Sequence, residues 1–162
     1  MRSSPRSLAL SALMAALIFV ATWLVHIPIP RTTGYLNLGD VFIVSAAFLV
    51  GGPLAAAAAA IGSGLADVAS GAAVYLPATV VIKAVMALAA GLICQRQAGF
   101  ARLLTAAVVA ELIMVGGYFA FEWMVFDLSY ALAALPFNAL QLLGNLVAVA
   151  VFAPALKRVP LE

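Results

Sequence analysis

Two charged side chains stand out in this sequence because each lies near the middle of a long apolar stretch. Lys83 lies within residues 75–93 and Glu111 within residues 103–126. A buried ammonium group can donate hydrogen bonds and a buried carboxylate can accept them, and both are unstable in apolar surroundings without a partner. They are therefore candidates for binding a polar ligand, although the two could instead pair with each other and hold two helices together.

Further polar side chains share the helical faces of these two groups. Thr79 precedes Lys83 by one helical turn. Tyr118 and Glu122 follow Glu111 at i+7 and i+11, which places all three on nearly the same face of a helix. These side chains would climb along one wall of a polar pocket.

Amide side chains form a third polar feature. Asn138, Gln141 and Asn145 are spaced at i, i+3 and i+7, so they make one stripe along an otherwise apolar helix. Amides both donate and accept hydrogen bonds, which suits a heteroaromatic ring bearing hydroxyl or amino groups. The alternative is ordinary hydrogen bonding between helices.

No catalytic or metal-binding pattern accompanies these residues. The chain has one histidine, His26, and one cysteine, Cys94, so a zinc site with the usual ligands is not expected. The sequence motifs of serine hydrolases, zinc proteases and P-loop NTPases are absent. We therefore expect a protein that is not an enzyme and that carries no metal or cofactor.

The composition requires a membrane environment. Of the 162 residues, 67% are hydrophobic and 9% are charged, whereas soluble domains have about 45–50% apolar and about 25% charged residues. Such a chain cannot make a polar surface, so we predict an all-α integral membrane protein in a lipid bilayer. The net charge of +2 gives no basis for nucleic-acid binding.

Six segments are expected to form transmembrane helices in a single transmembrane domain that covers residues 1–162. A span needs about 20 mostly apolar residues, so the second segment is short and can cross only if protein shelters Asp40 at its start. Asp67, near the end of the third, is expected to be structural, capping a helix or bonding to loop backbone. The expected helices are residues 8–26, 39–50, 53–70, 75–94, 102–126 and 130–154.

Basic residues support six spans and give an orientation. With six spans, one side of the membrane holds six basic residues and the other holds only Arg31. Because Lys and Arg accumulate in cytoplasmic loops, the N and C termini are both expected in the cytoplasm. The polar pocket would then open outward. The six basic residues are Arg2, Arg6, Arg96, Arg102, Lys157 and Arg158.

Small residues recur at four-residue spacing on two of the expected helices. Ala12 and Ala16 lie in the first, and Ala55 and Ala59 lie in the third. Small residues at this spacing let helix backbones approach closely in lipid. The two faces could therefore dock another membrane protein, although alanine is also common simply because it inserts easily.

Several short motifs, in their order along the chain, resemble one known family. With the six-span layout, the sequence over about residues 8–158 resembles the substrate-binding S components of energy-coupling factor (ECF) transporters, in particular the riboflavin-type group. The motifs are Gly34-Tyr35-Leu36-Asn37-Leu38-Gly39-Asp40, Gly52-Pro53, Gly62-Ser63-Gly64-Leu65-Ala66-Asp67, Tyr75-Leu76-Pro77-Ala78-Thr79, Ile82-Lys83, Glu111, Gly117-Tyr118-Phe119 and Pro136-Phe137-Asn138-Ala139-Leu140-Gln141.

The resemblance implies a subunit of an ATP-driven importer in the cytoplasmic (inner) membrane of a prokaryote. Such a subunit has six helices, binds a vitamin from outside and topples in the membrane while docked on a T subunit, powered by two ABC-type ATPase subunits. Family members contact the T subunit through AxxxA faces on their first and third helices. These faces correspond to Ala12/Ala16 and Ala55/Ala59 in this sequence.

The family's pocket uses the loop between the first two helices together with the fourth, fifth and sixth helices. Here the loop 28–37 is expected to close over a heteroaromatic vitamin or precursor such as riboflavin, pyridoxine or hydroxymethylpyrimidine. The expected substrate-binding residues are Asn37, Tyr75, Thr79, Lys83, Glu111, Tyr118, Asn138, Gln141 and Asn145.

Two other functions remain open from the sequence. The chain could be a small membrane scaffold or assembly subunit without a small-molecule ligand, in which case its buried polar groups are only structural. It could also be a stand-alone carrier driven by an ion gradient, with Glu111 as a proton site.

Overall fold

The structure, a computed structural model, describes residues 4–94, 99–156 and 158. This part of the chain folds into six α-helices, and a 3-10 turn, η1 (Ala73–Tyr75), leads into the fourth. Apolar stretches form the helices. Glycine or proline stands in most of the breaks, and Phe126-Asp127 separates α5 from α6. The helices are α1 (Pro5–Leu24), α2 (Gly39–Leu49), α3 (Gly52–Ala69), α4 (Leu76–Ile93), α5 (Phe100–Val125) and α6 (Leu128–Leu156).

The breaks between helices follow from local chemistry. Pro5 begins α1, where its missing N–H loses no hydrogen bond, and the Ser4 side chain caps the first turn by accepting from the Ser7 backbone N–H. Gly51, with a φ of +70°, separates α2 from α3. A left-handed backbone of this kind favours glycine because it has no Cβ.

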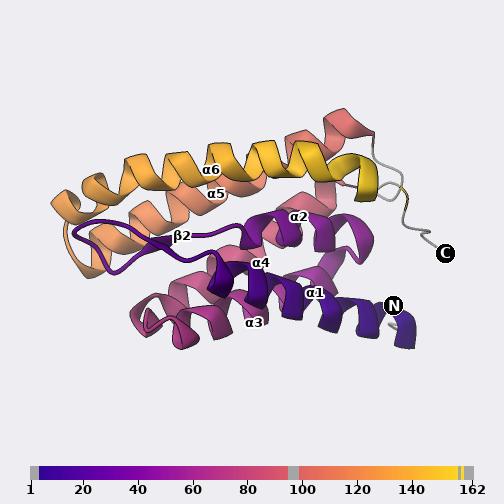
Figure 1. Ribbon diagram of the computed structural model, residues 1–162, viewed down its shortest axis with the longest axis horizontal. Helices are drawn as coiled ribbons and strands as arrows, with labels where there is room; N and C mark the ends of the chain where they lie inside the picture. The colour runs from indigo at the N-terminus through magenta and orange to yellow at the C-terminus, as the bar shows by residue number, and fades with distance from the viewer. Residues whose placement is uncertain (1–3, 95–98, 157, 159–162) are drawn as a thin grey trace.

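Helix α2 is the centre of the bundle. It contacts all five other helices, and every residue in it except Phe42 is buried. In Figure 1, α5 and α6 lie along one side of it, and α1, α3 and α4 lie along the other. Helix α1 begins and α6 ends at one end of the bundle, opposite the loop that carries β2.

Within the described part of the chain, five helices are long and apolar enough to cross a membrane: α1, α3, α4 with its leading 3-10 turn, α5 and α6. Helix α2 occupies the segment expected to be the second of six spans, but it has only 11 residues. At about 1.5 Å per residue it is roughly 17 Å long, against about 30 Å of hydrocarbon. Its burial explains how so short a helix is accommodated, because it meets protein on every side.

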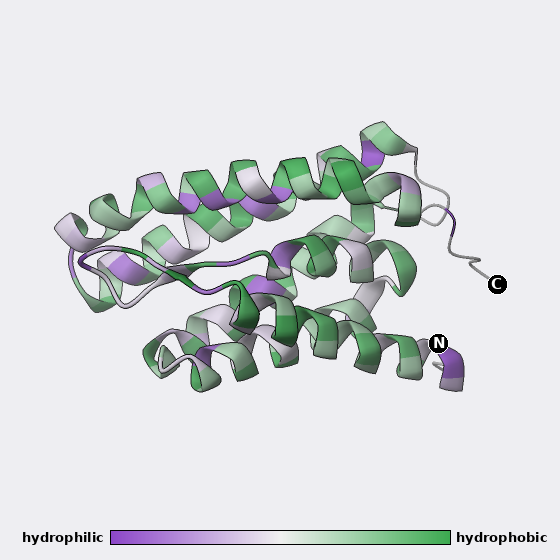
Figure 2. Ribbon diagram, in the orientation of Figure 1, coloured by the Kyte–Doolittle hydropathy of each residue, from purple (hydrophilic) through white to green (hydrophobic). Residues whose placement is uncertain are grey.

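The outer surface of the bundle is apolar, as Figure 2 shows by the predominance of hydrophobic colour along the helices. Large side chains such as Leu24, Leu92 and Met124 are 73%, 79% and 78% exposed. A soluble protein rarely exposes contiguous apolar surface on this scale. The protein is therefore a multi-pass membrane protein.

The loop between α1 and α2 departs slightly from the all-α expectation. Strand β1 (Ile27–Pro28) pairs antiparallel with β2 (Tyr35–Leu36). The Ile29 N–H also donates to the Gly34 carbonyl oxygen at 3.0 Å. Pro28 and Pro30 prevent a helix here, and this short hairpin satisfies part of the backbone instead.

Helices α1 and α3 approach closely, and the small residues serve this contact within the chain. Ala55 and Ala59 are both 0% exposed. They therefore do not lie on the outer face of the bundle, as docking to another membrane protein would require. Ser11 Oγ donates to the Leu54 carbonyl oxygen at 2.9 Å, and a Cβ added at Gly62 would lie 2.5 Å from the Ala15 carbonyl oxygen. Ala12 and Ala16, by contrast, are exposed on α1.

Helix α2 is fastened by a buried ion pair. Lys83 Nζ on α4 lies 2.5 Å from Asp40 Oδ1, and the two side chains are 2% and 0% exposed. Asp40 occupies the first turn of α2, where the positive end of the helix dipole also favours a carboxylate. Breaking such a pair leaves an uncompensated charge inside the bundle.

The close contact of α1 and α3 makes Gly62→Ala destabilising. The added methyl group must push α1 away, which we expect to lower stability by about 1–3 kcal/mol and the melting temperature in detergent accordingly. Gly116→Ala is the control, because Gly116 is on α5 with open space around it. Equal melting temperatures for the two variants would contradict this packing.

The ion pair makes Lys83→Met strongly destabilising, by about 3–5 kcal/mol, because Asp40 then remains buried without its cation. The double variant Asp40→Leu/Lys83→Met should recover part of that loss, because both charges are gone. Thermal unfolding in detergent measures both effects. If the double variant is no more stable than Lys83→Met, then loss of the ion pair is not the cause of the destabilisation by Lys83→Met.

Candidate substrate-binding pocket

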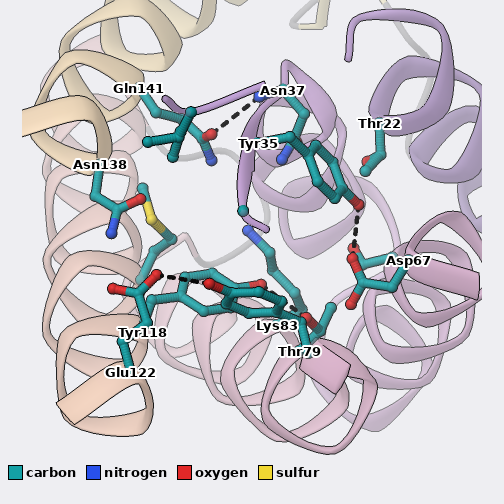
Figure 3. Close-up of a pocket in the computed structure, with 15 residues that line it drawn as sticks. Thr22, Tyr35, Asn37, Asp67, Thr79, Lys83, Tyr118, Glu122, Asn138 and Gln141 are labelled. Carbon is teal, nitrogen blue, oxygen red and sulfur yellow. Dashed lines mark hydrogen bonds between the residues drawn. The ribbon is translucent and has the colours of Figure 1, made fainter. Parts of the chain in front are cut away.

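A pocket lies inside the bundle at the end opposite the start of α1, beneath the α1–α2 loop. The empty space in the pocket, counting open solvent at its mouth, is about 450 Å³. Figure 3 shows its polar side chains converging from several helices and the loop. The lining residues are Thr22, Ile29, Gly34, Tyr35, Asn37, Ser63, Asp67, Tyr75, Thr79, Lys83, Met114, Tyr118, Glu122, Asn138 and Gln141.

The base of the pocket is a network around Asp40. Besides Lys83, this carboxylate accepts a hydrogen bond from Gln141 Nε2 at 2.9 Å and one from Asn145 Nδ2 at 3.4 Å. Both amides come from α6, so the Asp40 network joins α2, α4 and α6. The ion partner of Lys83 is therefore Asp40. The structural alternative offered by the sequence, a pair between Lys83 and Glu111, is not formed.

Glu111 and Asn145 lie deeper than the pocket. They are 1% and 0% exposed, and neither is among the lining residues. Each stands about one turn along its helix from a residue that does line the pocket, Met114 on α5 and Gln141 on α6. The structure thus places Asn145 in the Asp40 network and Glu111 close to it, and neither side chain lines the cavity.

Aromatic side chains form one wall. Tyr75 and Tyr118 meet edge to face, with ring centroids 6.0 Å apart, and Tyr118 Oη lies 3.0 Å from Thr79 Oγ1. Lys83 Nζ stands 5.4 Å from the centroid of the Tyr118 ring, within the range of a cation–π contact. This wall offers ring faces on which a planar ligand can stack.

The α1–α2 loop is tied to the helices at three points. The Thr33 N–H donates to Tyr130 Oη at 2.7 Å, the Asn37 N–H donates to Gln141 Oε1 at 2.9 Å, and Tyr35 Oη donates to Asp67 Oδ1 at 2.6 Å. The loop therefore forms a closed cover over the pocket, joined to α3 and α6.

The Tyr35 hydroxyl is held as a donor. Its burial, together with the neighbouring Asp67 carboxylate, raises the pKa of Tyr35 well above its usual value. A tyrosinate beside Asp67 would place two negative charges together, so the proton stays on Tyr35 and bonds to Asp67. Asp67 thus bonds to the loop, as expected, but through a side chain and while lining the pocket.

Five buried polar atoms that have no hydrogen-bond partner belong to pocket residues. Figure 3 places Thr22 and Asp67 on one side of the cavity and Glu122 and Asn138 on the other. Buried polar groups are nearly always hydrogen-bonded, so such atoms point to a missing ligand or water. The five atoms are Thr22 Oγ1, Ser63 Oγ, Asp67 Oδ2, Glu122 Oε2 and Asn138 Nδ2.

Carboxyl groups outnumber basic groups at the site. Among the described residues in and beneath the pocket, four carboxyl groups stand against one ammonium group, that of Lys83, and Arg31 of the loop is exposed. Within the described part of the chain, no cluster of His, Cys, Asp or Glu could hold a metal ion. The carboxyl groups are Asp40, Asp67, Glu111 and Glu122.

Most of the residues expected from sequence to bind substrate lie together in this pocket. Those that line it are Asn37, Tyr75, Thr79, Lys83, Tyr118, Asn138 and Gln141, and those that do not are Glu111 and Asn145. The sequence interpretation missed Thr22 and Ser63, whose small hydroxyls carry no distinctive signal inside apolar stretches. Glu122 was placed on the same helical face as Glu111 but was not assigned to the site. The i+11 spacing of Glu122 from Glu111 was the signal that could have assigned it.

Comparisons with known proteins agree with this architecture. Residues 2–158 match the family of the ECF-type riboflavin transporter S component. The chain is 31% identical over 154 residues to the thiamine precursor transporter HmpT of Lactococcus lactis subsp. cremoris (strain MG1363), covering 94% of this chain and 89% of that protein. It is 32% identical over 128 residues to an uncharacterised protein of Pyrococcus woesei, covering 79% of this chain and 86% of the other.

A family match over nearly the whole chain, an apolar helical bundle and an enclosed polar pocket agree with one another. This protein belongs to the ECF-type riboflavin transporter S component family, and it is a membrane-embedded transporter subunit that binds a vitamin or vitamin precursor.

Proposed function

We propose that this protein captures a one-ring heteroaromatic vitamin precursor, of the hydroxymethylpyrimidine type, from outside a prokaryotic cell. It then delivers the ligand inward together with an ECF T subunit and two ABC-type ATPases. The observation that carries the proposal is the covered pocket, in which five buried carboxylate, amide and hydroxyl atoms have no hydrogen-bond partner among the described residues.

The pocket chemistry favours a ligand that is neutral or cationic and rich in hydrogen-bond donors. Its carboxyl groups outnumber its one cation, and that cation, Lys83, is already paired with Asp40. An anionic ligand would meet repulsion without a free positive partner. The relative HmpT is named as a thiamine precursor transporter, which favours a precursor with a single heteroaromatic ring.

The proposed orientation places the pocket on the outer side of a prokaryotic cytoplasmic membrane. The protein then has six membrane helices, with α2 held inside the bundle, and both termini in the cytoplasm. Arg6 lies in the first turn of α1, Arg102 lies in the first turn of α5, and Arg158 follows α6, whereas Arg31 lies in the α1–α2 loop. Since α1 begins and α6 ends at the end of the bundle opposite this loop, this distribution agrees with the positive-inside rule. Arg2, Arg96 and Lys157 lie outside the described residues.

The proposed docking surface for the T subunit is the exposed face of α1. Ala12 and Ala16 are exposed there at four-residue spacing, which allows another helix to approach closely in lipid. Ala55 and Ala59 are buried inside the bundle and are not accessible to a partner. The third helix can contribute only through its outward residues, such as Ala57 and Ile61.

The substrate class is tested on protein purified in detergent. Denaturation followed by mass spectrometry should release a stoichiometric heteroaromatic vitamin precursor. Ligand-free protein should bind 4-amino-5-hydroxymethyl-2-methylpyrimidine, and should bind its phosphate ester at least about tenfold more weakly, because the acidic pocket repels the added charge. Tighter binding of the phosphate ester, or no binding to any heteroaromatic vitamin, would overturn the proposal.

The docking surface is tested with Ala16→Leu. The larger side chain should abolish co-purification with the T subunit of the host cell while leaving ligand binding unchanged, because α1 carries the contact and Ala16 does not line the pocket. Ala120→Leu, the same substitution on an exposed position of α5, is the control and should co-purify normally. Normal co-purification of Ala16→Leu would exclude this face.

A further inference from the structure

Glu122 and Asn138 form a distinct pair within the pocket. They come from α5 and α6, and they are 2% and 6% exposed. Glu122 Oε2 and Asn138 Nδ2 have no hydrogen-bond partner, so the two do not bond to each other. In Figure 3 they occupy the same side of the cavity, with the Asn138 amide nitrogen directed toward the Glu122 carboxylate.

The other oxygen of Glu122 is held in place by a relay of hydroxyl groups. Tyr75 Oη donates to Glu122 Oε1 at 3.0 Å. Because that proton is used, the 3.2 Å contact between Tyr75 Oη and Tyr130 Oη must be donated by Tyr130, which in turn accepts from the Thr33 N–H. The hydrogen bonds that run from the loop through these two tyrosines thus fix the orientation of the Glu122 carboxylate, and only its Oε2 is left for a ligand.

An unpartnered acceptor beside an unpartnered donor specifies a complementary ligand edge. Glu122 Oε2 requires an N–H or O–H group, and Asn138 Nδ2 requires an acceptor next to it. An exocyclic amino group adjacent to an unprotonated ring nitrogen presents this pattern in one plane. A ligand without the amino group would leave the buried carboxylate oxygen unsatisfied, which is costly.

We propose that Glu122 and Asn138 are the specificity-determining pair that recognises the amino group and the adjacent ring nitrogen of an aminopyrimidine. Glu122 accepts from the amino group, and Asn138 donates to the ring nitrogen. This inference rests on the proposed function and names the ligand edge that the pocket selects.

The first test compares two ligands on the unaltered protein in detergent by calorimetric titration. One is 4-amino-5-hydroxymethyl-2-methylpyrimidine, and the other is 5-hydroxymethyl-2-methylpyrimidine, which keeps the ring nitrogens and lacks the amino group. The pair predicts a preference of about 10–100-fold for the amino compound, the range expected for losing a hydrogen bond to a buried charged group.

The second test separates the two side chains. Glu122→Gln should reduce the preference for the amino compound to within about threefold, because the ligand amino group loses its charged acceptor. Asn138→Leu should instead weaken both compounds by similar factors, because both retain the ring nitrogen. Asp127→Asn, which removes an exposed carboxyl group at the same end of the bundle, is the control and should keep the full preference.

The outcomes distinguish this inference from the function on which it rests. If the unaltered protein binds both pyrimidines equally, or if Glu122→Gln keeps the full preference, the pair does not read the amino group, whereas the proposed substrate class stands. If neither pyrimidine binds, the proposed substrate class fails and this inference fails with it. A large amino preference that disappears in Glu122→Gln supports both.

Discussion

The ion pair between Asp40 and Lys83 is the constraint on which the rest of the structure depends. A charge inside a membrane bundle is tolerated only with a partner, so the first turn of α2 must lie against the middle of α4. The amides of Gln141 and Asn145 bring α6 to the same carboxylate. One carboxyl group thereby fixes a helix too short to span a membrane, and the pocket lies directly above this network.

The cover of the pocket and its recognition chemistry share the same groups. Each tie of the α1–α2 loop leads to a carboxyl group of the site: Tyr35 to Asp67, Asn37 through Gln141 to Asp40, and Thr33 through two tyrosines to Glu122. A ligand that engages these carboxyl groups therefore acts on the loop as well.

The acidic pocket is consistent with a subunit that takes up small donor-rich rings. In apolar surroundings each matched hydrogen bond discriminates strongly, because an analogue that lacks it leaves a buried polar group unsatisfied. The protein supplies stacking surfaces from Tyr75 and Tyr118 and polar groups from both sides of the cavity.

The sequence by itself determined the membrane class and the inward direction of the polar groups. Apolar stretches broken by residues such as Gly51 and Gly71 mark the helices, and the amides of α6 face inward because lipid cannot satisfy them. Periodicity defines the face of a helix but not the neighbour opposite it. Only the tertiary structure could pair Lys83 with Asp40, bury Ala55 and Ala59 against neighbouring helices, and bring Thr22 and Ser63 to the pocket, because these contacts join segments whose relative placement is set by packing.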